Sequence, residues 1–168
     1  SNTGIGYETA LDLYKKGAKV YIACRNEEKA LKAIQKMEAD GGTGELVYEQ
    51  LDLASLRSVK EFADNVIQAE SSLDLLINNA GIASMNHSIF TTMETVHKIL
   101  DVNVAGTFLF CREAAKLMQI HRFGRIVNFA TVATSLKTEG VAIYAASKAA
   151  VISLTQILSR EFSDYSIT

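Results

Sequence analysis

A tyrosine and a lysine four residues apart give this chain its clearest capacity for chemistry. Tyr144 and Lys148 lie in a stretch whose apolar residues recur at helical spacing, which places both side chains on one face of a helix. A neighbouring ammonium stabilises a phenolate, so the tyrosine hydroxyl becomes usable as a general acid or base. The spacing is common by chance, and the alternative is a packed tyrosine beside a solvated lysine. The pair therefore needs support from the rest of the sequence.

The elements that would position this pair alternate along the chain between short apolar strands and amphipathic helices. We predict strands over residues 18–24, 45–51, 73–78 and 124–130, and the beginning of another strand at 165–168. We predict helices over residues 6–16, 26–40, 55–69, 91–121 and 140–162, with an interruption of the fourth helix near Gly106. This alternation predicts an α/β fold with a doubly wound parallel sheet and helices on both faces.

In an open parallel sheet, ligands bind beyond the carboxyl ends of the strands, so the residues that follow each strand are the candidates for function. Arg25 follows the strand 18–24. In a dinucleotide-binding fold a cation there pairs with a ribose phosphate, whereas an acidic residue would bind a ribose hydroxyl. The alternative for Arg25 is a solvated charge at the start of the next helix, where Asn26 is a candidate N-cap.

Two further strand ends carry polar or small residues. Asp52 follows the second strand and is of a type that accepts a hydrogen bond from an adenine amino group, although we favour a helix cap, a role that Ser55 also offers. The stretch NNAG at 78–81 follows the third strand, and its small residues allow a ligand to approach the backbone closely. Its asparagine side chains can tie neighbouring loops together. An ordinary turn is the alternative for NNAG.

The chain opens with SNTGIG, in which Gly4 and Gly6 directly precede a helical pattern. Glycines of this kind mark a turn whose backbone N–H groups, with the helix N-terminus behind them, bind a phosphate. Read alone, the same residues are also compatible with a frayed chain end.

The bulk composition narrows the function classes. The chain has 168 residues, which is the size of one domain, and its net charge of −2 gives no indication of nucleic-acid binding. Cys24 and Cys111 are two well-separated cysteines, which favours reduced thiols and a cytoplasmic location. The three histidines lack metal-ligand spacing, so we expect no metal site. No apolar run approaches the length of a membrane helix, so we also expect no membrane segment.

Taken together, these motifs resemble the short-chain dehydrogenase/reductase family in its single-domain branch. SNTGIG is similar to the last six positions of its G-x-x-x-G-x-G turn, and NNAG matches in full. Asn103 matches the family's asparagine in a long helix, and Tyr144 with Lys148 matches its Y-x-x-x-K pair. Residues 1–80 resemble retinol-type dehydrogenases, and residues 90–168 are more similar to bacterial 3-oxoacyl reductases.

The resemblance implies a Rossmann-like domain that transfers hydride between a nicotinamide cofactor and a carbonyl/alcohol pair. Tyr144 would be the general acid/base and Lys148 would stabilise its phenolate and hold the nicotinamide ribose. Thr131 would hydrogen-bond the substrate carbonyl, and Asn103 would hold a water that links Lys148 to solvent. The cofactor would contact Asn2, Thr3, Gly4, Ile5, Gly6, Arg25, Asn26, Asp52, Leu53, Asn79, Ala80, Gly81, Tyr144 and Lys148. Arg25 favours NADP(H) over NAD(H).

The sequence departs from the family pattern in three places. The family's catalytic serine falls at Thr131, which keeps the hydroxyl; Ser135 is the second candidate, although it lies only nine residues before Tyr144. A strand that the family places first, between the strands 18–24 and 73–78, is absent. The family also continues for about 70 residues beyond this pattern. We therefore expect residues 1–168 to be one dinucleotide-binding domain that is truncated at both ends.

The same resemblance implies the partners and the rival functions. The substrate would be a small carbonyl or alcohol, and a homodimer or homotetramer is expected through the helices 91–121 and 140–162. A non-catalytic NADP-binding scaffold or regulatory protein on the same fold is the main alternative. An epimerase or dehydratase is disfavoured, because those enzymes use a wider G-x-x-G-x-x-G turn.

Overall fold

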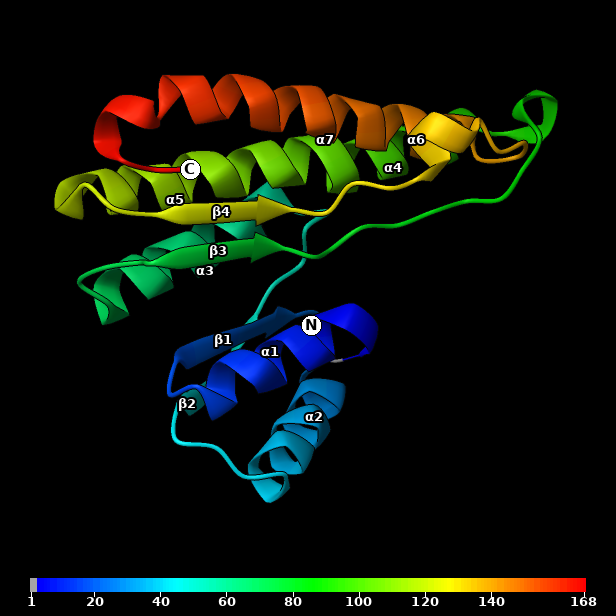
Figure 1. The fold of residues 1–168 in the computed structure, drawn as a ribbon. Coiled ribbons are helices and arrows are strands. Elements are labelled where there is room, and N and C mark those ends of the chain that lie inside the picture. Colours follow the sequence, from blue (N-terminus) through cyan, green and yellow to red (C-terminus); the bar gives the residue numbers. More distant parts are fainter. Residues whose placement is uncertain (1–2) are drawn as a thin grey trace. The chain divides into compact units, whose positions relative to one another are not determined.

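The computed structural model describes residues 3–168, so the prediction for Asn2 lies outside the described residues. The chain consists of two compact units, Ser1–Asp52 and Leu53–Thr168 (Figure 1). Each unit contains a pair of parallel strands with helices packed against it. The predicted α/β class with parallel strands is confirmed. The described strands form two separate two-stranded sheets, β1–β2 and β3–β4.

The first unit places two helices against the sheet formed by β1 (Lys19–Cys24) and β2 (Glu45–Gln50). Helix α1 (Gly4–Lys15) ends in a Schellman motif, because Gly17 has a positive φ of 89° and the N–H groups of Gly17 and Ala18 bind the carbonyls of Tyr14 and Leu13. Helix α2 (Glu27–Ala39) begins at Asn26, whose side chain accepts a hydrogen bond from the Lys29 N–H at 2.8 Å. The predicted Asn26 cap is confirmed.

A small apolar core holds these elements together. Its buried residues come from α1, β1 and α2: Tyr7, Ala10, Tyr14, Ile22, Ala30, Ala33, Ile34 and Met37. Each helix buries one face, as the 3.6-residue spacing of its apolar residues requires. The N-terminus of α1 and the residues after β1 are therefore held on a common scaffold.

The second unit is built on β3 (Leu75–Asn78) and β4 (Arg125–Asn128), which pair in parallel from Leu75 opposite Arg125 to Asn78 opposite Asn128. The chain end continues this sheet: Ile167 bridges to Gly124, and the Thr168 carbonyl accepts a hydrogen bond from the Ile126 N–H at 2.8 Å. The predicted beginning of a strand at 165–168 is thus confirmed for its last two residues.

The helices of this unit are α3 (Leu56–Ala69), α4 (Met93–Leu100), α5 (Thr107–His121), α6 (Ala133–Leu136) and α7 (Ala142–Glu161). Figure 1 shows α5 and α7 running along the β3–β4 sheet, with α5 in contact with β3 and α7 in contact with β4. Ala114, Ala115, Met118 and Ile167 form its buried core, with Leu76 and Ile126 packed against them. The sheet and both long helices therefore form one packed body.

The predicted interruption of the helix over 91–121 near Gly106 is confirmed as a π-helical turn, Asp101–Gly106. A short 3₁₀ turn, Ser88–Phe90, precedes α4. Two other local predictions need correction. Helix α6 lies in a segment for which no element was predicted. Ser55, and not Asp52, is the N-cap of α3, because its hydroxyl accepts the Ser58 N–H at 3.3 Å.

Helix α7 also qualifies the prediction that no segment reaches membrane-spanning length. Within residues 3–168, its 20 residues are long and apolar enough to cross a membrane by length and composition alone. One such helix is weak evidence, because the core helix of a soluble protein meets the same criteria. Here α7 packs against α4, α6, β4 and the π-helical turn.

The chain entering β2 approaches the end of α1 so closely that residue 44 has no room for a side chain. A Cβ on Gly44 would overlap the Ala18 carbonyl oxygen and lie 2.9 Å from the Tyr14 oxygen, and both are backbone atoms that cannot move aside. We predict that Gly44→Ala lowers the free energy of unfolding by about 1–3 kcal/mol, measured by urea denaturation. Gly41→Asn is the control, because no atom lies within 4 Å of its Cβ position and asparagine tolerates its positive φ. Equal losses for the two variants would contradict this account.

Candidate active site

Lys148 is the most unusual charged residue of the second unit, because α7 directs its side chain inward. The residue is only 5% exposed, although lysine is rarely buried. Its Nζ donates a hydrogen bond of 2.7 Å to the carbonyl oxygen of Phe129, which directly follows β4. Burial lowers the pKa of Lys148 from its ordinary value. The ammonium is therefore held at the carboxyl end of the sheet in a desolvated position.

Gly81 lies against this ammonium from the loop after β3. A Cβ at residue 81 would be 3.2 Å from Lys148 Nζ and 3.5 Å from Asn103 Oδ1. The close approach explains why the last residue of NNAG is a glycine, since any side chain would press on the ammonium. The loops after β3 and β4 thus meet the same lysine from two directions.

Asn103 fixes the loop after β3. It lies in the π-helical turn, is fully buried, and binds both backbone groups of Ile82: its Oδ1 accepts the N–H and its Nδ2 donates to the carbonyl, each at 2.9 Å. Its Nδ2 also donates to Ser147 Oγ at 3.0 Å. Both amide N–H donors are therefore used by protein groups, and the predicted water relay through Asn103 remains a prediction.

Tyr144 lies one helical turn before Lys148 and is half-buried. Its carbonyl oxygen accepts a hydrogen bond of 2.7 Å from Ser147 Oγ, which connects the first turn of α7 to Asn103. Within residues 3–168 its hydroxyl has no hydrogen-bond partner. The phenol is thus anchored through its backbone while its hydroxyl remains available to a ligand.

Thr131 follows β4 and is oriented by the start of α6. Its Oγ1 accepts a hydrogen bond of 3.3 Å from the Ala133 N–H, and its carbonyl accepts one of 2.8 Å from Thr134 Oγ1. Because the hydroxyl accepts from the backbone, its own hydrogen is left to donate to another group. Ser135, the second candidate, lies exposed within α6.

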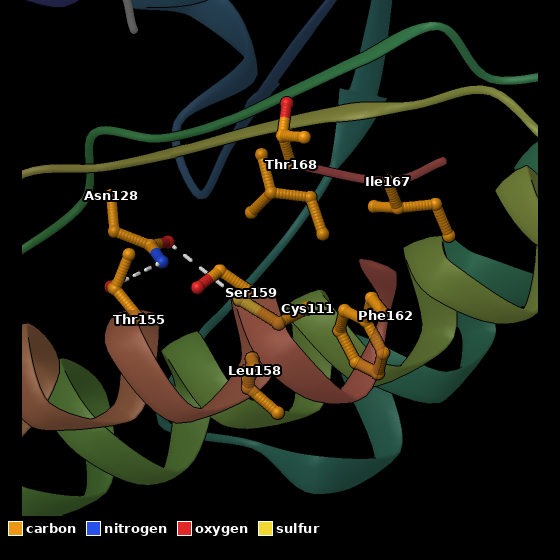
Figure 2. Close-up of a pocket in the computed structure, with 9 residues that line it drawn as sticks. Cys111, Asn128, Thr155, Leu158, Ser159, Phe162, Ile167 and Thr168 are labelled. Atoms are coloured by element: carbon orange, nitrogen blue, oxygen red, sulfur yellow. Dashed lines mark hydrogen bonds between the residues drawn. The ribbon is translucent and has the colours of Figure 1, made fainter. Parts of the chain in front are cut away.

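The paired asparagines at the ends of β3 and β4 support this edge of the sheet. Asn78 Nδ2 donates to Asn128 Oδ1 at 2.7 Å, and Asn128 Nδ2 donates to Thr155 Oγ1 of α7 at 2.9 Å. Figure 2 shows the hydrogen bonds of Asn128 to Thr155 and Cys111. These three residues line a cavity of about 30 Å³. This cavity has room for a water molecule, but neither Tyr144 nor Lys148 lines it. The asparagines therefore act as a brace between the strands and α7.

The first unit carries most of the predicted cofactor residues. Thr3, Gly4 and Ile5 are exposed at the N-terminus of α1, and Gly6 is buried in its first turn. The first backbone N–H groups of a helix have no partner within the helix and attract anions. Thr3 and Gly4 also line a groove of about 460 Å³, and Lys29, Lys32 and Lys36 of α2 line the same groove. This combination of helix N-terminus and lysines suits a phosphate-bearing ligand.

The residues after the two strands of this unit differ in how they are used. Arg25 is exposed, and within residues 3–168 its guanidinium forms no ion pair or hydrogen bond. Asn26 caps α2 through its side chain, which leaves less of that side chain for a ligand. Asp52 lies half-buried at the end of the unit and has an interaction partner within the protein.

The structure brings together part of the predicted site. Gly81 lies close to both Lys148 and Asn103, and Tyr144 is joined to Asn103 through Ser147. Leu53 is half-buried beside Gly106, whereas Asn79 and Ala80 lie in the loop that leads to Gly81. Within residues 3–168, no cluster of three or more histidine, cysteine or acidic side chains suits a metal ion.

Sequence reasoning missed three groups that build this site: the Phe129 carbonyl, the Ile82 backbone and the Ser147 hydroxyl. The first two are backbone groups and leave no signal in residue types. Ser147 had a signal, because it lies three residues after Tyr144 and so on the same helix face.

The comparisons with known proteins identify the family of the chain. The family model described as "short chain dehydrogenase" matches residues 1–168. The 3-oxoacyl-[acyl-carrier-protein] reductase FabG of Rickettsia prowazekii is 38% identical over 168 residues, which are 100% of this chain and 66% of that protein. Human retinol dehydrogenase 13 is 32% identical over 181 residues, covering 100% of this chain and 54% of that protein. The chain thus spans between about half and two thirds of these relatives.

Solved structures share the fold. A metagenomic short-chain oxidoreductase in complex with NADP superposes with a TM-score of 0.93 and 26% identity, covering 99% of this chain and 75% of that one. An NAD⁺-bound xylitol dehydrogenase gives a TM-score of 0.91 and 28% identity, covering 99% and 64%. The fold is therefore of the Rossmann type, and the chain belongs to the short-chain dehydrogenase family.

Proposed function

We propose that the protein is an NAD(P)-dependent oxidoreductase that interconverts a carbonyl and a secondary alcohol, with Tyr144 as general acid/base. The observation that carries the proposal is the buried Lys148 ammonium, held by the Phe129 carbonyl one helical turn after a tyrosine whose hydroxyl has no partner within residues 3–168. A buried cation costs free energy, and folds retain such groups mainly where chemistry uses them.

Each residue has a defined task in the reduction direction. Tyr144 Oη donates its proton to the oxygen of the substrate as that oxygen gains negative charge. Lys148 stabilises the phenolate that remains, because its charge is poorly screened in a desolvated position. Thr131 Oγ1 donates its free hydrogen to the same substrate oxygen and so lowers the energy of the transition state. The reverse proton movements serve alcohol oxidation.

The residues present fit a nicotinamide dinucleotide, which would supply or accept the hydride. Taken by itself, the first unit offers the α1 N-terminus at Thr3–Gly6, which suits a pyrophosphate. Within the second unit, Gly81 leaves open the space beside Lys148 that a side chain would fill. Lys148 would hold the nicotinamide ribose through its remaining N–H donors. Arg25 favours NADP(H) over NAD(H), because its guanidinium would pair with the additional phosphate of NADP(H). Lys29, which lines the groove with Thr3 and Gly4, adds a second positive charge to the first unit.

Exposed apolar side chains in the segments after β3 and β4 favour an apolar substrate. Large apolar side chains of the segments after β3 and β4 are between 63% and 85% exposed: Met85, Ile89, Phe90, Met93, Val132 and Leu136. The Asn86 N–H binds the Gly140 carbonyl at 2.8 Å, which joins these two segments. Residues 79–93 contain no Asp, Glu, Lys or Arg. A substrate with an alkyl or polyene chain would cover this apolar surface.

Tyr144→Phe tests the acid/base assignment. We predict that it lowers kcat for NADPH-dependent carbonyl reduction by about 10²–10⁴-fold, because the proton donor is removed. NADPH affinity, measured by fluorescence titration, should remain close to wild type. Tyr165→Phe is the control, since that tyrosine is 40% exposed in a turn outside the site. Retention of wild-type turnover by Tyr144→Phe would refute the assignment, and NADPH binding without turnover in the wild type would favour the scaffold alternative.

Arg25→Asp tests the cofactor preference. We predict that the ratio of kcat/KM for NADPH to that for NADH falls at least about tenfold, because a charge-assisted hydrogen bond to the phosphate is replaced by repulsion. Arg57→Asp makes the same charge change on the surface of α3, where its side chain is 87% exposed, and should leave the ratio unchanged. A ratio unaffected by Arg25→Asp would exclude Arg25 as the selecting residue.

A homologous series of straight-chain ketones tests the substrate class. We predict that kcat/KM rises by up to about fourfold per added methylene, the equivalent of about 0.8 kcal/mol per buried CH₂. Phe90→Ser should flatten this dependence, whereas Ile120→Ser, which removes an equally exposed apolar side chain at the end of α5, should not. Sugar-like polyols that are turned over as efficiently as the long-chain compounds would contradict the apolar assignment.

A further inference from the structure

Ser147 joins two parts of the candidate site that come from different elements. It is fully buried in α7, directly before Lys148 and three residues after Tyr144. Its Oγ accepts from Asn103 Nδ2 at 3.0 Å and donates to the Tyr144 carbonyl at 2.7 Å. One hydroxyl thus connects the π-helical turn to the first turn of α7.

The direction of these hydrogen bonds is determined by the backbone. Ile82 offers one N–H donor and one carbonyl acceptor, so the Asn103 amide must place its Oδ1 against the former and its Nδ2 against the latter. The second Nδ2 hydrogen then points to Ser147, which must accept it. The serine hydrogen is consequently left for the Tyr144 carbonyl, so every proton in this chain of bonds has one position.

The successive contacts form a closed series, which we call the ring, from Ser147 through Asn103 and Ile82 to Gly81 beside Lys148. Ser147 holds Asn103, Asn103 holds Ile82, and Ile82 is the neighbour of Gly81, whose backbone lies against Lys148 Nζ. Lys148 follows Ser147 in the same helix, so the ring begins and ends on α7. The serine hydroxyl therefore sets how closely the loop after β3 covers the lysine.

We propose that Ser147 is a positioning residue: its hydroxyl orients the Asn103 amide and thereby keeps the Gly81 backbone against Lys148. The part that concerns catalysis depends on the oxidoreductase function proposed above, whereas the geometric part does not. Without the hydroxyl, one buried Asn103 N–H loses its acceptor, and the amide is free to turn away from Ile82. Gly81 then loses its restraint, and water gains access to Lys148.

Loss of the Ser147 hydroxyl is expected to change the pKa of Lys148 in one direction. Burial is what lowers the pKa of Lys148, so access of water raises that pKa towards its ordinary value. The Phe129 carbonyl that binds the ammonium and the Gly81 backbone beside it do not titrate, and neither does the Asn103 amide near Gly81. On α7 itself, Tyr144 lies one turn earlier. The charged side chains of elements packed on α7 are exposed and do not contribute to the shift: Glu94, His97, Lys98, Asp101, Arg125 and Asp164.

The direct test is an NMR titration of Lys148 in the full-length protein labelled with [¹³Cε]lysine. We expect the titration midpoint of Lys148 to rise by about half a pH unit or more in Ser147→Ala. Ser147→Thr, which keeps the hydroxyl, should restore the wild-type midpoint. Ser159→Ala is the matched control, because Ser159 makes the same bond to a carbonyl three residues earlier, at 3.0 Å to Gln156, but is exposed and has no asparagine partner.

Kinetics provide the second measurement. In Ser147→Ala, kcat for NADPH-dependent reduction should fall about tenfold, and the pH dependence of kcat should move to higher pH, with little change in KM. If the serine acts through Asn103, the double variant Ser147→Ala/Asn103→Ala should be no slower than Asn103→Ala alone. Additive losses would show that Ser147 acts independently and would overturn the proposal.

The remaining outcomes are also decisive. If Ser147→Ala does not fold, Ser147→Cys replaces it, because cysteine is similar in shape but forms only weak hydrogen bonds, and its Lys148 midpoint should rise as well. An unchanged midpoint in the Ala or Cys variant would overturn the proposal. A raised midpoint in a protein without hydride-transfer activity would support the positioning role and refute only the proposed function.

Discussion

The burial of one ammonium is the constraint on which the second unit depends. A lysine that is 5% exposed loses most of its hydration, a cost of several kcal/mol unless protein groups compensate for it. Here the compensation is a 2.7 Å hydrogen bond to the Phe129 carbonyl and the close approach of the Gly81 backbone. Both groups follow parallel strands, so the lysine requires that β3 and β4 end side by side.

The rest of this unit is arranged to hold those strand ends against α7. Asn78 and Asn128 join the two strands through their side chains, and Thr155 joins Asn128 to the helix. The π-helical turn carries Asn103, whose side chain binds both backbone groups of Ile82, and a regular helix would present this side chain in a different direction. Asn103 is fully buried and its amide groups are hydrogen-bonded, whereas Asn78, Asn128 and Thr155 are half-buried. Hydrogen-bond networks of this kind favour a single geometry over alternatives.

Much of the fold could be predicted from residue patterns, because the signals are local. Apolar runs identified β1 to β4, and Asn26 and Gly17 marked helix ends through chemistry that operates within a few residues. The π-helical turn was anticipated only as an interruption near Gly106, since its cause is tertiary: Asn103 must reach Ile82, 21 residues away. The cap of α3 was assigned to Asp52 before Ser55 because both residue types can cap, and only the geometry distinguishes them.

The candidate site shows the same difference between residues that local patterns reveal and contacts that depend on the tertiary structure. Tyr144, Lys148 and Gly81 were identified because side-chain chemistry and spacing are visible in a sequence, whereas the Phe129 and Ile82 backbone groups are not. The central claim is that these residues serve hydride transfer between a nicotinamide cofactor and a carbonyl. Its most direct test is reduction of a long-chain ketone with each of the two stereoisomers of [4-²H]NADPH, followed by mass spectrometry of the product. The account predicts deuterium on the carbinol carbon with one of the two isomers; NADPH binding without any transfer of deuterium would contradict it.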